Sequence, residues 1–233
     1  MRLALLLLIA AASVAQAKVF DRVMNVAGTP VYYKIVLPRD FDPAKTYPGV
    51  LAFPPGSQGM DMVQTTVLRN WLPEAERRGY IVVTPSAPLG KLFVREGAQV
   101  FPAFLDQLLK DYKIRDGKFY AAGMSNGGLS AFHIAATYPQ YFYSVTGFPG
   151  YLPNATPERV NALKGLCLHM FVGELDTGWL IQMEKQASEL RSQGFTVSLS
   201  VEKGQGHVMS TLTGAGSARL FDQIETSARG CAR

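Results

Sequence analysis

Short apolar runs alternate with segments of helical periodicity along most of the chain. The runs with the length of a strand are 49–53, 80–84, 118–122, 142–148, 166–172 and 195–201. Apolar residues recur at helical spacing in 66–78, 100–112, 127–138, 180–193 and 215–227. An earlier run, 31–37, alternates apolar and polar positions, which predicts an antiparallel strand or hairpin. Fully apolar strands separated by helices predict an α/β fold, with a mostly parallel central sheet and helices on both faces.

A serine between two glycines follows one of these strands and precedes a helix. The pattern is G-x-S-x-G over residues 123–127, with Ser125 at its centre and another glycine at 128. This context is typical of a nucleophile elbow, a sharp turn that lifts a serine hydroxyl clear of the backbone. The glycines leave room for the turn, and the amide of Asn126 points to where negative charge would develop. We therefore predict Ser125 as a nucleophile and Asn126 as an oxyanion donor; a glycine-rich turn that holds a serine by chance is the alternative.

A serine nucleophile needs a base, and histidine is the usual one. The chain has three histidines. His133 lies two turns into the helix after the serine, where we expect it to pack against the sheet, and His169 lies within an apolar strand, where we expect it to be buried and hydrogen-bonded. His207 follows the strand 196–201 in a loop with glycines at 204 and 206, which allow its side chain to reach over the sheet edge. We predict His207 as the base, with an ordinary loop histidine as the alternative.

The imidazole in turn needs a carboxylate that fixes its tautomer. Asp176 lies just past the end of the strand 166–172, and Glu174 is the competing acid, although side-chain alternation directs it elsewhere. The chain order Ser125, Asp176, His207 is that of the α/β hydrolases. The separations of 51 and 31 residues allow each partner to follow a later strand, because one βα unit takes about 30 residues. We predict these three residues as a catalytic triad.

A second oxyanion donor is expected from the loop after the strand 49–53. That loop begins with Pro54 and Pro55, which have no amide hydrogen. Gly56 and Ser57 do have one, so the donor is predicted to be one of these two.

With these motifs, the chain resembles the α/β-hydrolase superfamily, and within it the small secreted esterases related to polyhydroxybutyrate depolymerases and feruloyl esterases. The resemblance extends from about Tyr47 to His207 and rests on the segments 76–85, 113–120, 123–128, 173–176 and 206–207. It implies hydrolysis of a carboxylic ester, with Ser125 as nucleophile, His207 as base and then acid, and Asp176 as the residue that orients His207.

One departure from this family concerns the oxyanion loop. Relatives usually carry His-Gly where this chain has Pro54-Pro55, so we expect a stiffer loop with its donors shifted by a residue. The segment 141–157 is the best candidate for pocket walls, and Trp179 and Phe148 are predicted to line the substrate pocket. Ordinary core packing is the alternative for these aromatic residues.

The first 17 residues differ from the rest. One basic residue, Arg2, precedes the apolar run 3–12 and the small residues Ala15 and Ala17, a pattern typical of a cleaved signal peptide. The apolar run is shorter than the ~20 residues that span a bilayer. We expect a secreted or periplasmic protein that starts near Lys18, without stable membrane insertion; an uncleaved anchor is the alternative. The remainder, 18–233, has the length of one α/β domain and lacks repeats or linkers.

Cysteine usage and charge bear on partners. Export would carry Cys167 and Cys231 into an oxidising compartment, where they can form a disulfide; Cys167 as a buried apolar residue is the alternative. A net charge of +5 without runs of like charge gives no indication of nucleic-acid binding. Scattered histidines and distant cysteines predict neither a metal site nor a cofactor.

These observations predict a serine hydrolase that cleaves small-molecule or polymeric carboxylic esters through an acyl-enzyme. A peptidase or thioesterase with the same triad is one alternative, because the triad forms the same tetrahedral intermediate on any acyl group. A noncatalytic binding module on a hydrolase fold is the alternative of another class.

Overall fold

The computed structural model describes residues 18–228 and 230, and the strands of this part form one eight-stranded sheet. Its strands are β1 (Lys18–Val26), β2 (Thr29–Leu37), β3 (Tyr47–Phe53), β4 (Ile81–Pro85), β5 (Ile114–Gly123), β6 (Phe142–Gly147), β7 (Cys167–Gly173) and β8 (Val197–Glu202). Their order is β1-β2-β4-β3-β5-β6-β7-β8. The β1–β2 hairpin is antiparallel and β2 pairs antiparallel with β4, whereas all other neighbours are parallel. The predicted mostly parallel α/β sheet is confirmed.

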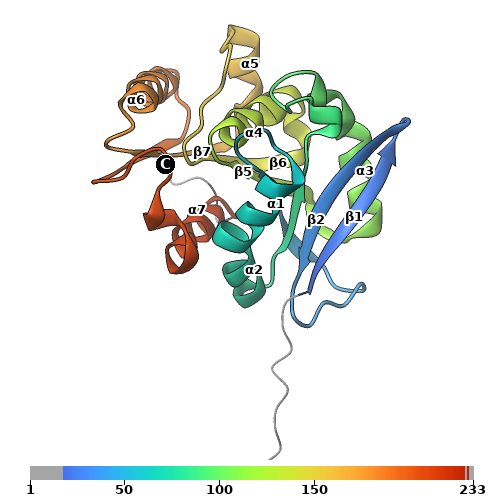
Figure 1. Cartoon of the computed structure of the whole chain (residues 1–233). Coiled ribbons are helices and arrows are strands. Elements are labelled where there is room, and N and C mark those ends of the chain that lie inside the picture. The colour runs from blue at the N-terminus through green and yellow to red at the C-terminus, as the bar shows by residue number, and fades with distance from the viewer. Residues whose placement is uncertain (1–17, 229, 231–233) are drawn as a thin grey trace, which may run out of the picture.

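Helices lie on both sides of this sheet (Figure 1). They are α1 (Met60–Thr66), α2 (Leu72–Arg78), α3 (Phe101–Asp111), α4 (Asn126–Thr137), α5 (Pro157–Ala162), α6 (Thr177–Ser192) and α7 (Ala218–Ala228). The helix expected over 66–78 starts earlier and is continuous from α1 to α2 through a π-helical turn, Val67–Trp71. Pro73, in the first turn of α2, lacks the amide that would continue the α-helical hydrogen bonds across this junction.

Strand β5 begins at Ile114, earlier than the expected 118–122. Asp116 and Gly117, both with positive φ, have the composition of a turn but lie within the strand as a local irregularity. Strand β1 and helix α5 were not predicted, because each is short or weakly apolar and is defined by pairing or packing with distant segments.

The sheet separates two hydrophobic cores. Successive strand residues point to opposite faces, so Leu51 and Phe53 of β3 face one core while Val50 and Ala52 face the other. Helices α3 to α6 cover the first core, and α1, α2 and α7 cover the second. Because both faces are covered, the central strands are apolar at nearly every position.

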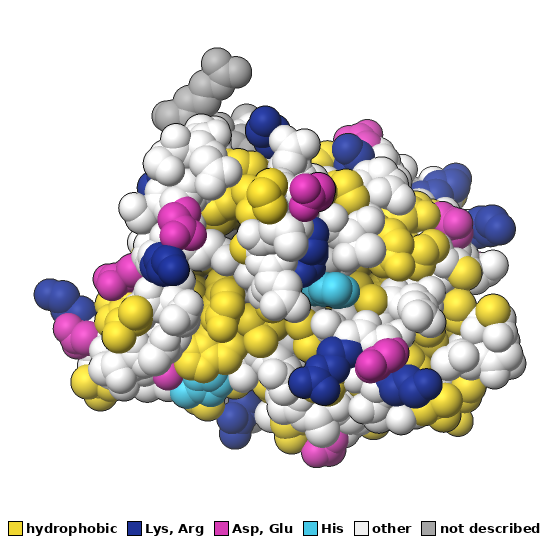
Figure 2. All heavy atoms as spheres, turned by 90° about the horizontal axis from the view of Figure 1, so that it is seen from above, with side chains coloured by type: hydrophobic (Ala, Val, Ile, Leu, Met, Phe, Trp, Pro, Cys, Tyr) yellow, Lys and Arg dark blue, Asp and Glu magenta, His cyan; other side chains and the backbone are white. Residues whose placement is uncertain are grey.

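The carboxyl ends of the parallel strands form the upper edge of the sheet in Figure 1, at the same end as the tip of the β1–β2 hairpin. Figure 2 looks down on this edge, where hydrophobic side chains gather in patches between charged ones. In sheets of this kind, ligands bind beyond the carboxyl ends of the strands. The functional site is therefore expected on the face seen in Figure 2.

Two predicted features involve residues outside the described part. Residues 1–17 are not described, so the signal peptide stays a prediction. Cys167 is buried at the start of β7 and is disulfide-bonded. Cys231 lies outside the described residues, so the pairing of Cys167 with Cys231 also stays a prediction. Across residues 18–228, no helix combines the length and the apolar character needed to cross a bilayer.

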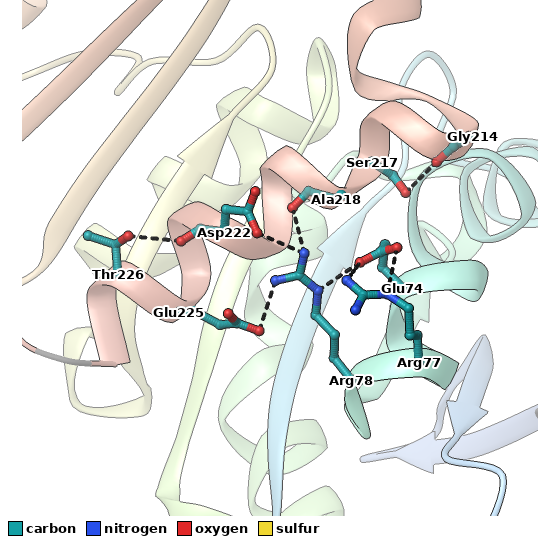
Figure 3. Close-up of polar contacts among 9 residues, drawn as sticks. All are labelled: Glu74, Arg77, Arg78, Gly214, Ser217, Ala218, Asp222, Glu225 and Thr226. Carbon is teal, nitrogen blue, oxygen red and sulfur yellow. Dashed lines mark hydrogen bonds and ion pairs between the residues drawn. The ribbon is translucent and has the colours of Figure 1, made fainter.

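Arg78, at the end of α2, joins this helix to α7 (Figure 3). Its Nε donates to Glu74 at 2.7 Å, and its Nη2 donates to Asp222 at 2.7 Å. Nη1 pairs with Glu225 at 2.9 Å, and Nη2 also reaches the carbonyl oxygen of Ala218 at 3.3 Å. Only 11% of the Arg78 side chain is exposed. This largely buried cation thus holds carboxylates from two helices that cover the second core.

We expect Arg78→Met to lower the free energy of unfolding by about 2 kcal/mol, because Asp222 and Glu225 lose their counter-charge and Glu74 keeps only the exposed Arg77. Arg77→Met is a matched control: Arg77 pairs with the same Glu74, but its side chain is 62% exposed, so its replacement should destabilise the fold much less than that of Arg78. Urea unfolding of the two variants measures the difference, and equal losses would contradict the buried role of Arg78.

Candidate active site

Ser125 lies at the turn between β5 and α4 in a backbone conformation that side-chain-bearing residues rarely adopt. Its φ is 57° and its ψ is −122°. A Cβ at Gly123 would lie 2.2 Å from the carbonyl oxygen of Gly127, and a Cβ at Gly127 would lie 2.1 Å from that of Phe53. Only glycine fits at these two positions, so the strand and the helix pack backbone against backbone. The turn has the geometry expected of a nucleophile elbow.

The structure brings Ser125, His207 and Asp176 together from the ends of β5, β8 and β7. Nε2 of His207 lies 2.8 Å from Oγ of Ser125, and Nδ1 lies 2.7 Å from Oδ2 of Asp176. The Asp176 side chain is 14% exposed, whereas that of His207 is 38% exposed. When Nδ1 donates its proton to the carboxylate, Nε2 keeps the lone pair that can accept the serine proton. The arrangement can therefore generate a serine nucleophile at a position open to substrate.

Glu174, the competing acid, does not contact the imidazole. Its side chain accepts a hydrogen bond from the amide of Gly204 at 2.9 Å, and its own amide donates to the carbonyl oxygen of Glu202 at 3.0 Å. Glu174 thus fastens the loop that leads to His207, and Asp176 is the carboxylate that reaches the ring.

The loops that carry Asp176 and His207 touch along their backbones. The amide of Leu175 donates to the carbonyl oxygen of Gln205 at 2.9 Å. A Cβ at Gly173 would lie 2.2 Å from the carbonyl oxygen of Gly206 and 2.4 Å from that of Gln205. The absence of a side chain at Gly173 is what allows the two loops to approach closely enough for the Asp176–His207 hydrogen bond.

Glu202, at the end of β8, is a buried carboxylate that fixes both ends of the His207 loop. It accepts hydrogen bonds from both Nη atoms of Arg219, from Oγ of Ser200 and from Oγ1 of Thr211. The Arg219 hydrogen bonds, with those of Thr211 and Ser200, lower the pKa of Glu202 to about 2. The sequence offered no signal for this role, because Arg219 and Thr211 lie on later segments of the chain.

The predicted oxyanion donors lie next to each other. Within the described residues, the amides of Asn126, Gly56 and Ser57 are left without a hydrogen-bond acceptor. The side chain of Asn126 donates to the carbonyl oxygen of Gly56 at 2.9 Å, which holds the loop after β3 against the start of α4. Free amides at a helix start and in the adjacent loop can accommodate a developing negative charge. Gly56 and Ser57 stay alternatives for the second donor.

Of the two predicted pocket residues, only Trp179 lies at the site. Its ring centroid is 5.2 Å from that of His207 and 5.4 Å from that of Tyr151. The prediction for Phe148 is wrong: it is 1% exposed and packs edge-on against Trp71 in the second core. Phe148 directly follows β6, and its ring lies in the second core, away from the site. Tyr151, three residues later, is the aromatic residue of this segment that adjoins Trp179.

The other two histidines have structural partners. His169 is buried between the hydroxyls of Ser198 and Ser227, at 2.8 and 2.7 Å, and burial lowers its pKa to about 4. His133 is half-buried on α4, and its Nδ1 accepts from Nη2 of Arg159 on α5 at 2.7 Å. Burial and the Arg159 charge lower the pKa of His133 to about 4. In the described ranges, no three His, Cys, Asp or Glu residues are placed to hold a metal ion.

Comparisons with known proteins agree with this architecture. No family model and no curated protein matches the sequence. A ferulic acid esterase has a TM-score of 0.72 at 18% identity, over 92% of this chain and 98% of that protein. The S-formylglutathione hydrolase from Agrobacterium tumefaciens has a TM-score of 0.66 at 14% identity, over 96% and 99% of the two chains. A thermostable esterase has a TM-score of 0.68 at 16% identity over 92% of this chain, which spans 62% of that esterase.

These similarities establish the fold. The chain has the α/β-hydrolase fold, as the chain order of Ser125, Asp176 and His207 and the resemblance to this superfamily predicted.

We expect Gly173→Ala to separate the Asp176 and His207 loops, because the new methyl group would meet two carbonyl oxygens. The free energy of unfolding should fall by about 1–3 kcal/mol, and the NMR resonance of the hydrogen-bonded Nδ1 proton of His207 should be lost. Gly178→Ala is the control, since a Cβ at Gly178 would have no neighbouring atom within 4 Å and the change favours the helix. An intact resonance in Gly173→Ala would contradict this account.

The low pKa of Glu202 predicts an acid-dependent loss of stability. Its carboxyl group titrates near 4.5 when unfolded and at about 2 when folded, so its contribution is complete above pH 5 and is lost as the pH falls toward 2. Glu202→Gln should cost about 2 kcal/mol at pH 7, and the difference from wild type should shrink toward pH 2. Unfolding free energies measured for both proteins across this range test the prediction; curves that stay parallel would contradict it.

Proposed function

We propose that this α/β hydrolase cleaves carboxylic esters through an acyl-enzyme formed on Ser125. The observation that carries the proposal is the continuous hydrogen-bonded series from Ser125 Oγ through both ring nitrogens of His207 to Asp176. Further support comes from the elbow conformation of Ser125 and from the free amides beside it. A noncatalytic binding module would not need this combination of features.

The reaction follows from the geometry. His207 Nε2 takes the proton of Ser125 as Oγ attacks the ester carbonyl carbon, and Asp176 stabilises the imidazolium that forms. The amide of Asn126 and that of Gly56 or Ser57 donate to the oxyanion of the tetrahedral intermediate. The imidazolium then protonates the leaving alkoxide as the carbon–oxygen bond breaks. Water, activated by His207, attacks the acyl-enzyme and releases the acid and free Ser125.

The choice of first substrates follows from the site and from the similar structures. Trp179 and Tyr151 form an aromatic wall beside His207, which suits a flat aromatic group in the substrate. The similar structures include a ferulic acid esterase and an S-formylglutathione hydrolase. Feruloyl esters, simple nitrophenyl esters of increasing chain length and the thioester S-formylglutathione therefore form the first panel, with peptide nitroanilides to test the peptidase alternative.

We expect a fluorophosphonate probe to label wild-type protein at Ser125. Ser125→Ala should lose the label and at least about 10³-fold in kcat toward the best ester of the panel, because nucleophilic catalysis is removed. Ser188→Ala, an exposed serine on α6, should keep both. Wild-type protein that takes no label and hydrolyses no member of the panel would contradict the proposal and favour a binding role.

A further inference from the structure

Gln58 is a buried polar residue in the loop that carries two of the candidate oxyanion donors. None of its surface is exposed, and its φ of 57° lies in the left-handed region that favours glycine. A buried amide in this conformation is stable only when its partners offset both the desolvation and the backbone strain. The contacts of Gln58 therefore indicate what the residue does.

The side-chain amide of Gln58 joins three separate segments. Its Oε1 accepts from the amide of Phe93, in the segment after β4, at 2.9 Å. Its Nε2 donates to the carbonyl oxygen of Pro54 at 3.2 Å and to Oγ of Ser130 on α4 at 3.0 Å. Both N–H groups and the carbonyl oxygen of the amide are thus used.

The backbone of Gln58 closes the turn that holds the candidate donors. Its amide donates to the carbonyl oxygen of Pro55 at 3.0 Å, and its carbonyl oxygen accepts from the amide of Ala87 at 2.8 Å. Gly56 and Ser57 lie between the ends of this turn. The hydrogen bonds that hold Gln58 in place therefore also fix the direction in which the free amides of Gly56 and Ser57 point.

The bond to Ser130 connects this turn with the other half of the oxyanion hole. Oγ of Ser130 donates to the carbonyl oxygen of Asn126 at 2.7 Å, in the first turn of α4. The Asn126 side chain reaches back to the carbonyl oxygen of Gly56. The loop and the helix start are thus fastened at two points, one through Gln58 and one through Asn126.

We propose that Gln58 is a positioning residue of the oxyanion hole, which fixes the amides of Gly56 and Ser57 relative to that of Asn126. The inference rests on the proposed ester hydrolysis, since only a reaction with an oxyanion intermediate uses these amides together. Donors stabilise such an intermediate only when they are held at hydrogen-bond distance from the oxyanion before it forms. Gln58 supplies that constraint without touching the substrate.

Gln58→Met keeps the size of the side chain and removes its three hydrogen bonds. Because the charge on the oxyanion develops in the transition state, we expect kcat per active site to fall about 10- to 100-fold while KM changes less than about threefold. Counting active sites with the fluorophosphonate probe removes unfolded molecules from the comparison. A trifluoromethyl ketone, which forms a tetrahedral adduct with the serine, should bind more weakly by the same factor as the loss in kcat/KM.

Two further variants keep the test decisive. Ser130→Ala removes one acceptor of Gln58 without altering the loop, and should lower kcat about three- to tenfold. Combined with Gln58→Met it should add little, because the bond between the two side chains is already lost in Gln58→Met. Ser227→Ala is the control: it removes a buried hydroxyl that bonds His169, and should lower Tm without changing kcat per active site.

The proposal is overturned if folded Gln58→Met keeps kcat per active site within about twofold of wild type and binds the ketone normally. If Gln58→Met does not fold, an unchanged kcat in Ser130→Ala overturns it instead. Failure of the proposed function is a separate result, because the wild-type protein itself would then hydrolyse no ester and take no probe.

Discussion

The site depends on backbone packing at the turn between β5 and α4. No side chain fits at Gly123 or Gly127, where a Cβ would lie 2.2 and 2.1 Å from carbonyl oxygens. The amide of Ser125 donates to the carbonyl oxygen of Pro149 at 2.8 Å, which ties the turn to the segment after β6. The unusual φ of Ser125 persists because the surrounding segments determine it. Its hydroxyl is thereby held at one fixed point, and the other strand ends are arranged around that point.

The loops around Ser125 are held by two kinds of contact. Close backbone approach at Gly173 brings the Asp176 and His207 loops together, and buried polar side chains fasten the loops at their ends. Gln58 fastens the loop after β3 and Glu202 fastens the loop after β8. Both side chains are buried and fully hydrogen-bonded. A buried polar group with all its partners rigidifies a loop, whereas one that lacks a partner destabilises the loop. A catalytic arrangement gains from such rigidity, because its groups need no reorganisation during the reaction.

The arrangement of Ser125, Asp176 and His207 could be predicted because each of these residues has a local signal in the sequence. The turn at Ser125 is a contiguous motif, and Asp176 and His207 directly follow apolar strands whose carboxyl ends meet at one edge. Gln58 and Glu202 have no such signal: Gln58 bonds Phe93 and Ser130, which lie 35 and 72 residues away. The wrong prediction for Phe148 has the same origin, because distant segments decide on which face of the sheet a side chain packs. The same holds for the helix predicted to start at residue 66, which begins earlier as α1.

The segment that carries Tyr151 is fastened in the same way, by an amide side chain of α6. Gln186 of α6 accepts from the amide of Leu152 at 2.8 Å and donates to its carbonyl oxygen at 2.9 Å. This pair holds the segment next to Tyr151 against the helix that carries Trp179. Because the amide side chains of Gln58 and Gln186 each clamp a backbone segment near the site, the shape of the site is set in the free protein. For the proposed ester hydrolysis, we therefore expect selectivity for the acyl group to depend on side chains such as Trp179 and Tyr151 more than on loop closure.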